Sequence, residues 1–406
     1  MDISRLKGVI QRLSIFKDYS SLLVPVVIVL VGALIFIPTQ LMSSKLSKEI
    51  SKESVSIGKR IKSLSQDVVS SDQWMEEEKY QEAYERDANQ IALLAKQSSQ
   101  RQLLSYKIFP EPKDTSTLIF KEFGRKFREA VDGQIARVNA RDCPTAAELQ
   151  RSLQSSGTSR RPGRRGGSSS RLNERDTIIE DVLCREKAEA ASVYANPADL
   201  SGYEFWGEHE YAGMGEAVKD CWYWQLAYWV IEDVIDTIAA CNSGSDSVFT
   251  SPVKRLMAVS FTMSGRGSGS RGKAGDRPSY VLSIEDGLTG SLTARLSNDD
   301  IDVVHFNVIV VVSAKAVLPF MQQLCSAKQH SFRGFFGEAQ EQIFKHNQIA
   351  ILEYGVASIN RGDIEHNLYR YGEDAVVRLD LICEYIFNKN GYDEIKPELV
   401  KNEHKP

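Results

Sequence analysis

An uncharged stretch near the amino end constrains this chain more than any other feature. No Asp, Glu, Lys or Arg occurs between Asp18 and Lys45, and residues 22–37 are apolar apart from one proline and one glycine. As a helix, residues 22–42 would be roughly 30 Å long at ~1.5 Å per residue, which matches the hydrocarbon core of a bilayer. The sequence therefore predicts a single transmembrane helix over residues 19–42.

The flanks of this stretch bear on its orientation. The basic residues of the tail, residues 1–18, favour a cytoplasmic amino terminus, although Lys and Arg residues also follow the span. A secretory signal peptide is the alternative, but residues 37–40 offer no small-x-small cleavage site. We therefore expect an uncleaved anchor in a bacterial-type inner (cytoplasmic) membrane. The lipid bilayer is then a partner, and residues 43–406 are expected to be periplasmic or otherwise extracytoplasmic.

A heptad pattern follows the apolar stretch. Its two interleaved sets occupy the a and d positions of a coiled coil. The alternative is one amphipathic helix lying on its own domain. A new helix is expected from about Gln73 to Gln100, because Ser and Asp precede it and glutamates fill its first turn. We therefore predict a coiled-coil stalk over residues 43–110, with an oligomer interface at Ile50, Ile57, Ile61, Leu64 and Val68.

Two arginine-rich stretches interrupt the rest of the chain. Residues 111–205 have helical patterns, but residues 156–171 contain no apolar side chain and are predicted to be a disordered linker. A second Gly/Ser/Arg loop covers residues 264–277. The two stretches are either solvated linkers or contacts for a polyanion such as a cell-wall polymer. No aromatic side chain is interleaved to stack bases, so nucleic acid is not the favoured partner. The candidate contact residues are Arg160, Arg161, Arg164 and Arg165.

The carboxyl-terminal half has the clearest pattern. Helical patterns alternate with pairs of strand patterns in residues 206–390, and a polar tail covers residues 391–406. Two α-β-β units predict a four-stranded antiparallel sheet with two helices on one face. The predicted fold class is thus α+β, a circularly shifted ferredoxin-like αββαββ domain with extra helices. The expected elements are helices at 214–241 and 314–328 and strands at 253–263, 280–284, 301–313, 347–359 and 375–387.

Together, the tail, span, stalk and sheet domain resemble the PilO and GspM families, inner-membrane assembly proteins of type IV pili and type II secretion. The resemblance covers residues 1–100 and 214–387 as an order of elements. It implies a non-enzymatic scaffold that forms a homodimer or hetero-oligomer with similar membrane proteins. The alternative hypothesis is a membrane-tethered module that binds or senses a polyanion through its arginine-rich loops.

The sequence predicts no enzyme, cofactor, metal or small-molecule substrate. With 50 Lys and Arg against 54 Asp and Glu, the net charge of −4 excludes a globally basic nucleic-acid binder. Residues 267–273 match part of a phosphate-binding loop, but Ala274 replaces the required Ser or Thr and a strand pattern follows. The histidines lack the spacing of a metal site, and no nucleophile–base arrangement is visible.

Cysteine and tryptophan residues provide the remaining candidates. No C-x-x-C spacing occurs among the 6 Cys residues. The pair Cys143 and Cys184 could form a disulfide that joins the helices on either side of the linker. Trp222 and Trp229 lie on the predicted helix 214–241. They are either core residues or anchors for a partner, because interfaces favour tryptophan.

Overall fold

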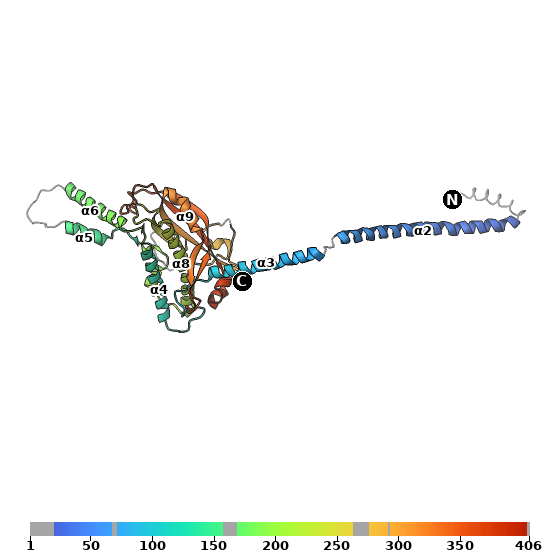
Figure 1. Cartoon of the computed structure of the whole chain (residues 1–406), viewed down its shortest axis with the longest axis horizontal. Coiled ribbons are helices and arrows are strands. Elements are labelled where there is room, and N and C mark those ends of the chain that lie inside the picture. Colours follow the sequence, from blue (N-terminus) through green and yellow to red (C-terminus); the bar gives the residue numbers. More distant parts are fainter. Residues whose placement is uncertain (1–19, 67–70, 157–168, 263–275, 291–292, 404–406) are drawn as a thin grey trace, which may run out of the picture. The chain divides into compact units, whose positions relative to one another are not determined.

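The structure, a computed structural model, describes residues 20–66, 71–156, 169–262, 276–290 and 293–403 (Figure 1). The chain divides into two units, Met1–Asp87 and Ala88–Pro406. The first contains helix α2 (Ser20–Gln66) and most of helix α3 (Ser71–Ser99). The second holds the last turns of α3 and every described strand.

The predicted transmembrane helix over residues 19–42 is wrong. Among the residues that the structure describes, no helix has the length and apolarity needed to cross a membrane. The apolar run of residues 22–37 ends before Pro38, Thr39 and Gln40. Helix α2 continues beyond it into a segment rich in lysine. The same finding contradicts the predicted membrane location and the single-pass topology with residues 43–406 outside. Residues 1–18, the predicted cytoplasmic tail, lie outside the described residues.

The second unit is α+β with a mixed sheet. Four long strands pair antiparallel in the order β3-β4-β8-β7. Two short strands, β1 and β2, extend the sheet in parallel at the β3 edge, so that it has six strands rather than the predicted four. The strands are β1 (Ala140–Arg141), β2 (Val193–Tyr194), β3 (Val253–Ser260), β4 (Ile301–Ser313), β7 (Ile349–Ser358) and β8 (Val376–Asn388).

A separate hairpin, β5 (Lys328–Phe332) and β6 (Gln342–His346), was not expected from the sequence. The expected strand at 280–284 is reduced to one bridge, between Tyr280 and Val304, before a short 3-10 helix. The helix expected at 314–328 ends earlier, at Leu324.

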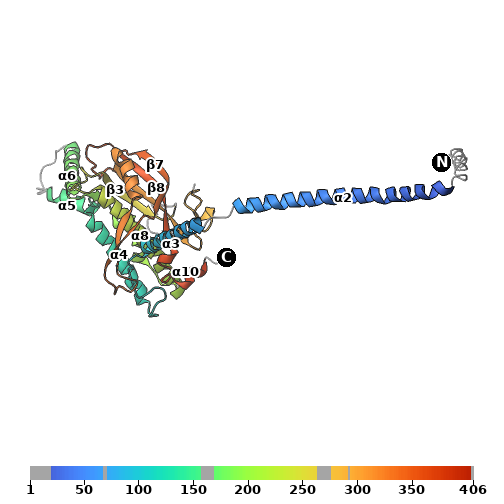
Figure 2. The ribbon, with the colours of Figure 1, turned by 45° about the vertical axis from the view of Figure 1, so that its right-hand side comes forward.

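Helices cover the sheet in layers. Helix α8 lies between α4 and the sheet, and α5 and α6 project side by side from the unit (Figures 1 and 2). The helices are α4 (Leu118–Arg137), α5 (Ala146–Ser156), α6 (Ser169–Glu189), α7 (Tyr203–Glu208), α8 (Met214–Cys241), α9 (Val317–Leu324) and α10 (Glu398–Glu403). The 3-10 helices are η2 (Pro197–Asp199), η5 (Ile284–Asp286), η6 (Ala314–Ala316) and η7 (Lys389–Gly391).

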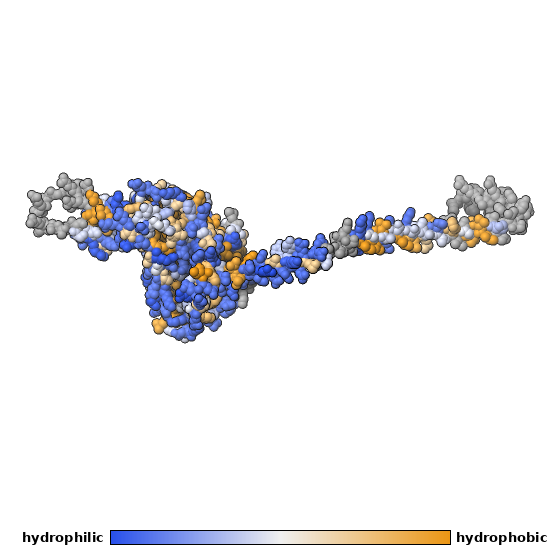
Figure 3. Space-filling view, in the orientation of Figure 1, coloured by the Kyte–Doolittle hydropathy of each residue, from blue (hydrophilic) through white to orange (hydrophobic). Residues whose placement is uncertain are grey.

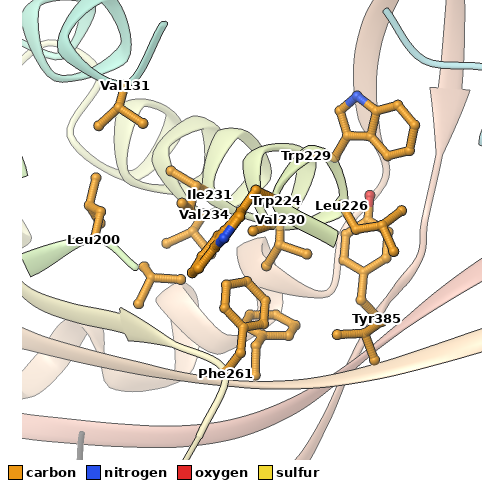
Figure 4. Close-up of a cluster of buried hydrophobic side chains, with 14 of the residues drawn as sticks. Val131, Leu200, Trp224, Leu226, Trp229, Val230, Ile231, Val234, Phe261 and Tyr385 are labelled. Carbon is orange, nitrogen blue, oxygen red and sulfur yellow. The ribbon is translucent and has the colours of Figure 1, made fainter. Parts of the chain in front are cut away.

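The core forms where α8 packs on the sheet. Because α8 is apolar on nearly all sides, it can be buried between two layers rather than lying at the surface. Figure 4 shows Trp224 and Val230 of α8 pointing toward Phe261, while Leu226 lies beside Tyr385 of β8. Phenylalanines of α4 join the same cluster from the other side. The core therefore fixes α8 rigidly, and with it the polar side chains near the middle of this helix.

Candidate functional site

A buried polar network stands out within this apolar core. Asp233 of α8 is completely buried, and its carboxylate accepts hydrogen bonds from three side chains of other segments. Arg101, just after α3, donates from Nη2 to Oδ1 at 2.9 Å. Tyr385 of β8 donates to Oδ2 at 2.7 Å, and His346 of β6 donates from Nε2 to the same oxygen at 2.8 Å.

Arg101 links this network to the end of α3. Its Nη1 donates to the Tyr385 hydroxyl at 2.6 Å, and its Nη2 donates also to Glu232 at 2.6 Å. The Ser99 hydroxyl accepts from the backbone N–H of Asn388 at 2.9 Å. A Cβ at Gly391 would lie 2.5 Å from the Lys96 carbonyl oxygen, so only glycine lets η7 approach α3 this closely. The last turn of α3 is thus fixed to the sheet.

Two histidines extend the network to the hairpin. His346 Nδ1 lies 2.8 Å from His330 Nδ1, and His330 Nε2 lies 2.9 Å from the carbonyl oxygen of Gln100. A continuous chain therefore runs from Asp233 through both imidazoles to the backbone that follows α3. It connects α8, the β5–β6 hairpin and the α3 end.

Burial and neighbouring charges shift the titration of these groups. Burial alone would raise the pKa of Asp233, but the charge of Arg101 and the hydrogen bond from His346 hold that pKa well below its usual range. Burial, with the charges of Arg101 and His346, lowers the pKa of His330 to about 4. Burial raises the pKa of Glu232, although Arg101 opposes the shift. At neutral pH the site holds Asp233 as a carboxylate and His330 as a neutral ring.

A cleft of about 390 Å³ opens beside the network. His330 lies in its wall, but each nitrogen of both imidazoles already has a partner within the chain of hydrogen bonds. A general base or metal ligand needs a free lone pair directed at the substrate or ion, which this arrangement does not offer. In the described part of the chain, no group of three or more His, Cys, Asp or Glu could hold a metal ion. The lining includes Arg101, Gln134, Arg137, Tyr228, Glu232 and His330.

Four of the five predicted interface residues, Ile50, Ile57, Ile61 and Leu64, lie on α2 in the first unit. Ile50, Ile57 and Ile61 have exposed fractions of 60%, 56% and 61%. Leu64 belongs to α2, but its side chain is outside the described set, and Val68 is outside the described residues altogether.

The other candidates fall in different places. Trp222 and Trp229 are buried, and their indole N–H groups donate to the Tyr280 hydroxyl and the Gln102 carbonyl. A partner could reach neither without unfolding α8, so the core interpretation of both is the one that the structure supports. Arg160, Arg161, Arg164 and Arg165 lie outside the described residues.

Cys143 and Cys184 both have free thiols in the structure. Cys184 is buried and Cys143 is half-buried. Burial raises the pKa of Cys184 to about 11, and a charge on Cys143 would add to that shift. The disulfide between them stays a prediction.

Sequence reasoning missed every member of the buried network. His330 and His346 are 16 residues apart, and Asp233 precedes His346 by 113 residues. No local spacing connects them. A weak signal did exist: Asp233 is an ionisable residue within a strongly apolar helix pattern, and a buried charge there requires a partner.

Comparisons with known proteins add little. No family model matches the chain, and no curated protein does. One similar solved structure is described only as a crystal structure from Akkermansia muciniphila. It has 10% sequence identity and a TM-score of 0.24, and the match covers 77% of this chain and 96% of that one. At that TM-score the likeness supports no argument about fold or function. The resemblance to the PilO and GspM families stays a prediction.

Proposed function

We propose that this chain is a self-assembling structural protein whose helix α2 pairs with α2 of a second copy. The contact surface is the α2 stripe, which we define as Leu46, Ile50, Ile57 and Ile61. At about 100° per residue, these four side chains lie within roughly 60° of one another around the helix. They form one narrow apolar line over four turns.

The exposure of this stripe carries the proposal. Leu46, Ile50, Ile57 and Ile61 each leave more than half of their surface open to water. Figure 3 shows hydrophobic residues recurring along α2 among hydrophilic ones. Burying one such side chain fully is worth about 1.5–3 kcal/mol. Because helices gain most of their stability from packing of an apolar face, α2 needs a partner surface.

A second copy fits this surface better than an unrelated protein. The stripe residues are spaced by four, seven and four positions, a pattern that packs well against a helix with the same spacing. A second copy always has that spacing, at the same concentration as the first. The buried network supports a structural role as well, because its imidazole nitrogens are used within the fold.

The test is co-expression of two copies with different affinity tags. Capture of one tag should co-purify the other copy from the wild type. The double variant Ile57→Ser/Ile61→Ser should lose this capture. Val55→Ser is the matched control, because Val55 is 55% exposed on the opposite side of the same helix. Equal capture by all three proteins would contradict the proposal.

The alternative function, polyanion binding, depends on the arginine-rich stretches 156–171 and 264–277. Most of both stretches, residues 157–168 and 264–275, lies outside the described residues, and this part includes all four candidate arginines. This alternative therefore stays a prediction.

A further inference from the structure

We propose that His330 and His346 share a single proton, and that this proton couples the β5–β6 hairpin to the end of α3 in a pH-dependent manner. The inference does not rest on self-association. It follows from the hydrogen-bond chain between two fixed acceptors, the Asp233 carboxylate and the Gln100 carbonyl.

The number of protons in this chain is determined by its ends. A carboxylate and a carbonyl can only accept, so His346 Nε2 and His330 Nε2 must both carry a proton. The two Nδ1 atoms lie 2.8 Å apart, a hydrogen-bond distance, so one proton lies between them. Two neutral imidazoles hold only two N–H protons in total. The pair therefore carries one additional proton and one positive charge.

Any other protonation state breaks the chain. Without the shared proton, two lone pairs face each other at 2.8 Å. With a second added proton, two N–H groups face each other instead. In both cases the contact between β5 and β6 side chains changes from attractive to repulsive, and the histidine next to Gln100 is free to rotate.

The charges around the pair favour the singly protonated state. Arg101 from the α3 end is cationic, and Asp233 and Glu232 of α8 are anionic. The shared proton makes this group neutral. Asp236 of α8, which is paired with Arg137 of α4, lies further out. Lys328 of β5 donates to the carbonyls at the end of α9, and the Tyr385 hydroxyl of β8 stays protonated because burial raises its pKa.

The consequence is a junction that loosens at acid pH. Protonating the neutral ring of His330 removes the Nδ1 lone pair that accepts the hydrogen bond from His346. The ring is then free to rotate, and the Gln100 carbonyl loses its ordered donor. Residues 97–104 and the hairpin, residues 328–346, would open together, while β4 and β8 remain paired along their whole length.

Hydrogen exchange of the full chain tests this coupling. Protection factors, which correct for the intrinsic pH dependence of exchange, are compared at pH 7 and pH 4. In the wild type we expect peptides from 97–104 and 328–346 to lose protection by roughly tenfold or more at pH 4, with β4 and β8 unchanged. In His330→Gln this acid-induced loss should disappear. His366→Gln is the control, because His366 is a buried histidine that contacts Tyr371 elsewhere.

Unchanged wild-type protection across this range, or the same loss in His330→Gln, would overturn the proposal. Nitrogen-15 spectra of histidine-labelled wild type give a second test that needs no variant. At pH 7 the pair should show three ring N–H protons on its two rings. Two neutral rings, or two doubly protonated rings, would exclude a shared proton.

Discussion

Asp233 shows how one buried carboxylate can join distant segments. Its oxygens accept from Arg101, His346 and Tyr385, all of which are buried. The Asp233→Asn variant keeps the shape but leaves Arg101 without its closest fully buried counter-charge. We expect the free energy of unfolding, measured with urea, to fall by about 3 kcal/mol.

Asp236→Asn is the control for this variant. Asp236 lies one helical turn further along α8 and pairs with the half-exposed Arg137. Removing a partly exposed pair should cost about 1 kcal/mol or less. If the two variants lose equal stability, the network does not hold the fold as we describe.

The depressed pKa of His330 predicts a pH dependence of stability. The ring titrates at about 4 in the folded state and at ~6.5 when unfolded. Between these values the unfolded state binds more protons, so stability is greatest above pH 6.5 and falls as the pH drops toward 4. Allowing for screening by water, the loss should be about 2 kcal/mol.

Urea denaturation at pH 7 and pH 4.5 measures this loss. The His330→Gln variant lacks the titrating imidazole. The difference in its free energy of unfolding between the two pH values should therefore be smaller than in the wild type. A wild type and a variant with the same pH slope would show that His330 titrates normally.

At the residue scale, the sequence could predict core positions but not the polar network. An apolar residue on a periodic face predicts its own burial, as for Trp222 and Trp229. A buried histidine is predicted only when its partners are known. Those partners come from α8, β6 and the segment after α3, and only the completed topology places them together.

Helix α4 contains two glycines with opposite expected effects. A Cβ at Gly124 would lie 2.5 Å from Cε3 of Trp206, whereas a Cβ at Gly133 would meet nothing within 4 Å. Gly124→Ala should therefore lower the free energy of unfolding by about 1–3 kcal/mol through overpacking. Gly133→Ala should raise it by about 0.5–1 kcal/mol, because alanine loses less backbone entropy in a helix.

Thermal melting followed by circular dichroism measures both changes. The two variants differ only in position along one helix, so each is the control for the other. The packing of α7 on α4 would be different from our description if Gly124→Ala were as stable as Gly133→Ala.

At the scale of elements, long strands were predictable and short or polar ones were not. Alternating or continuous apolar patterns predicted the strands that became β3, β4, β7 and β8. The strands β1 and β2 have two residues each, too few for any periodicity. The hairpin strand β5 reads Lys-Gln-His-Ser-Phe, with no apolar alternation. It pairs with β6, and its His330 contacts the carbonyl of Gln100, which is distant in the sequence.

At the scale of the molecule, apolar patterns in the amino-terminal part predicted a need for burial but not what supplies it. The prediction that residues 19–42 cross a membrane was wrong, since no described helix could cross one. The α2 stripe is a separate feature, and its spacing is typical of a helix that packs against another helix. This stripe is the part of the amino-terminal prediction on which the proposed function is based.

Sedimentation equilibrium of the full chain tests self-assembly most directly. The chain has a mass of 45.5 kDa, and the account predicts a species of twice that mass or a higher multiple. The Ile57→Ser/Ile61→Ser variant should shift toward the mass of one chain, while Val55→Ser should sediment as the wild type does. A wild type that sediments at 45.5 kDa at every concentration would contradict the account.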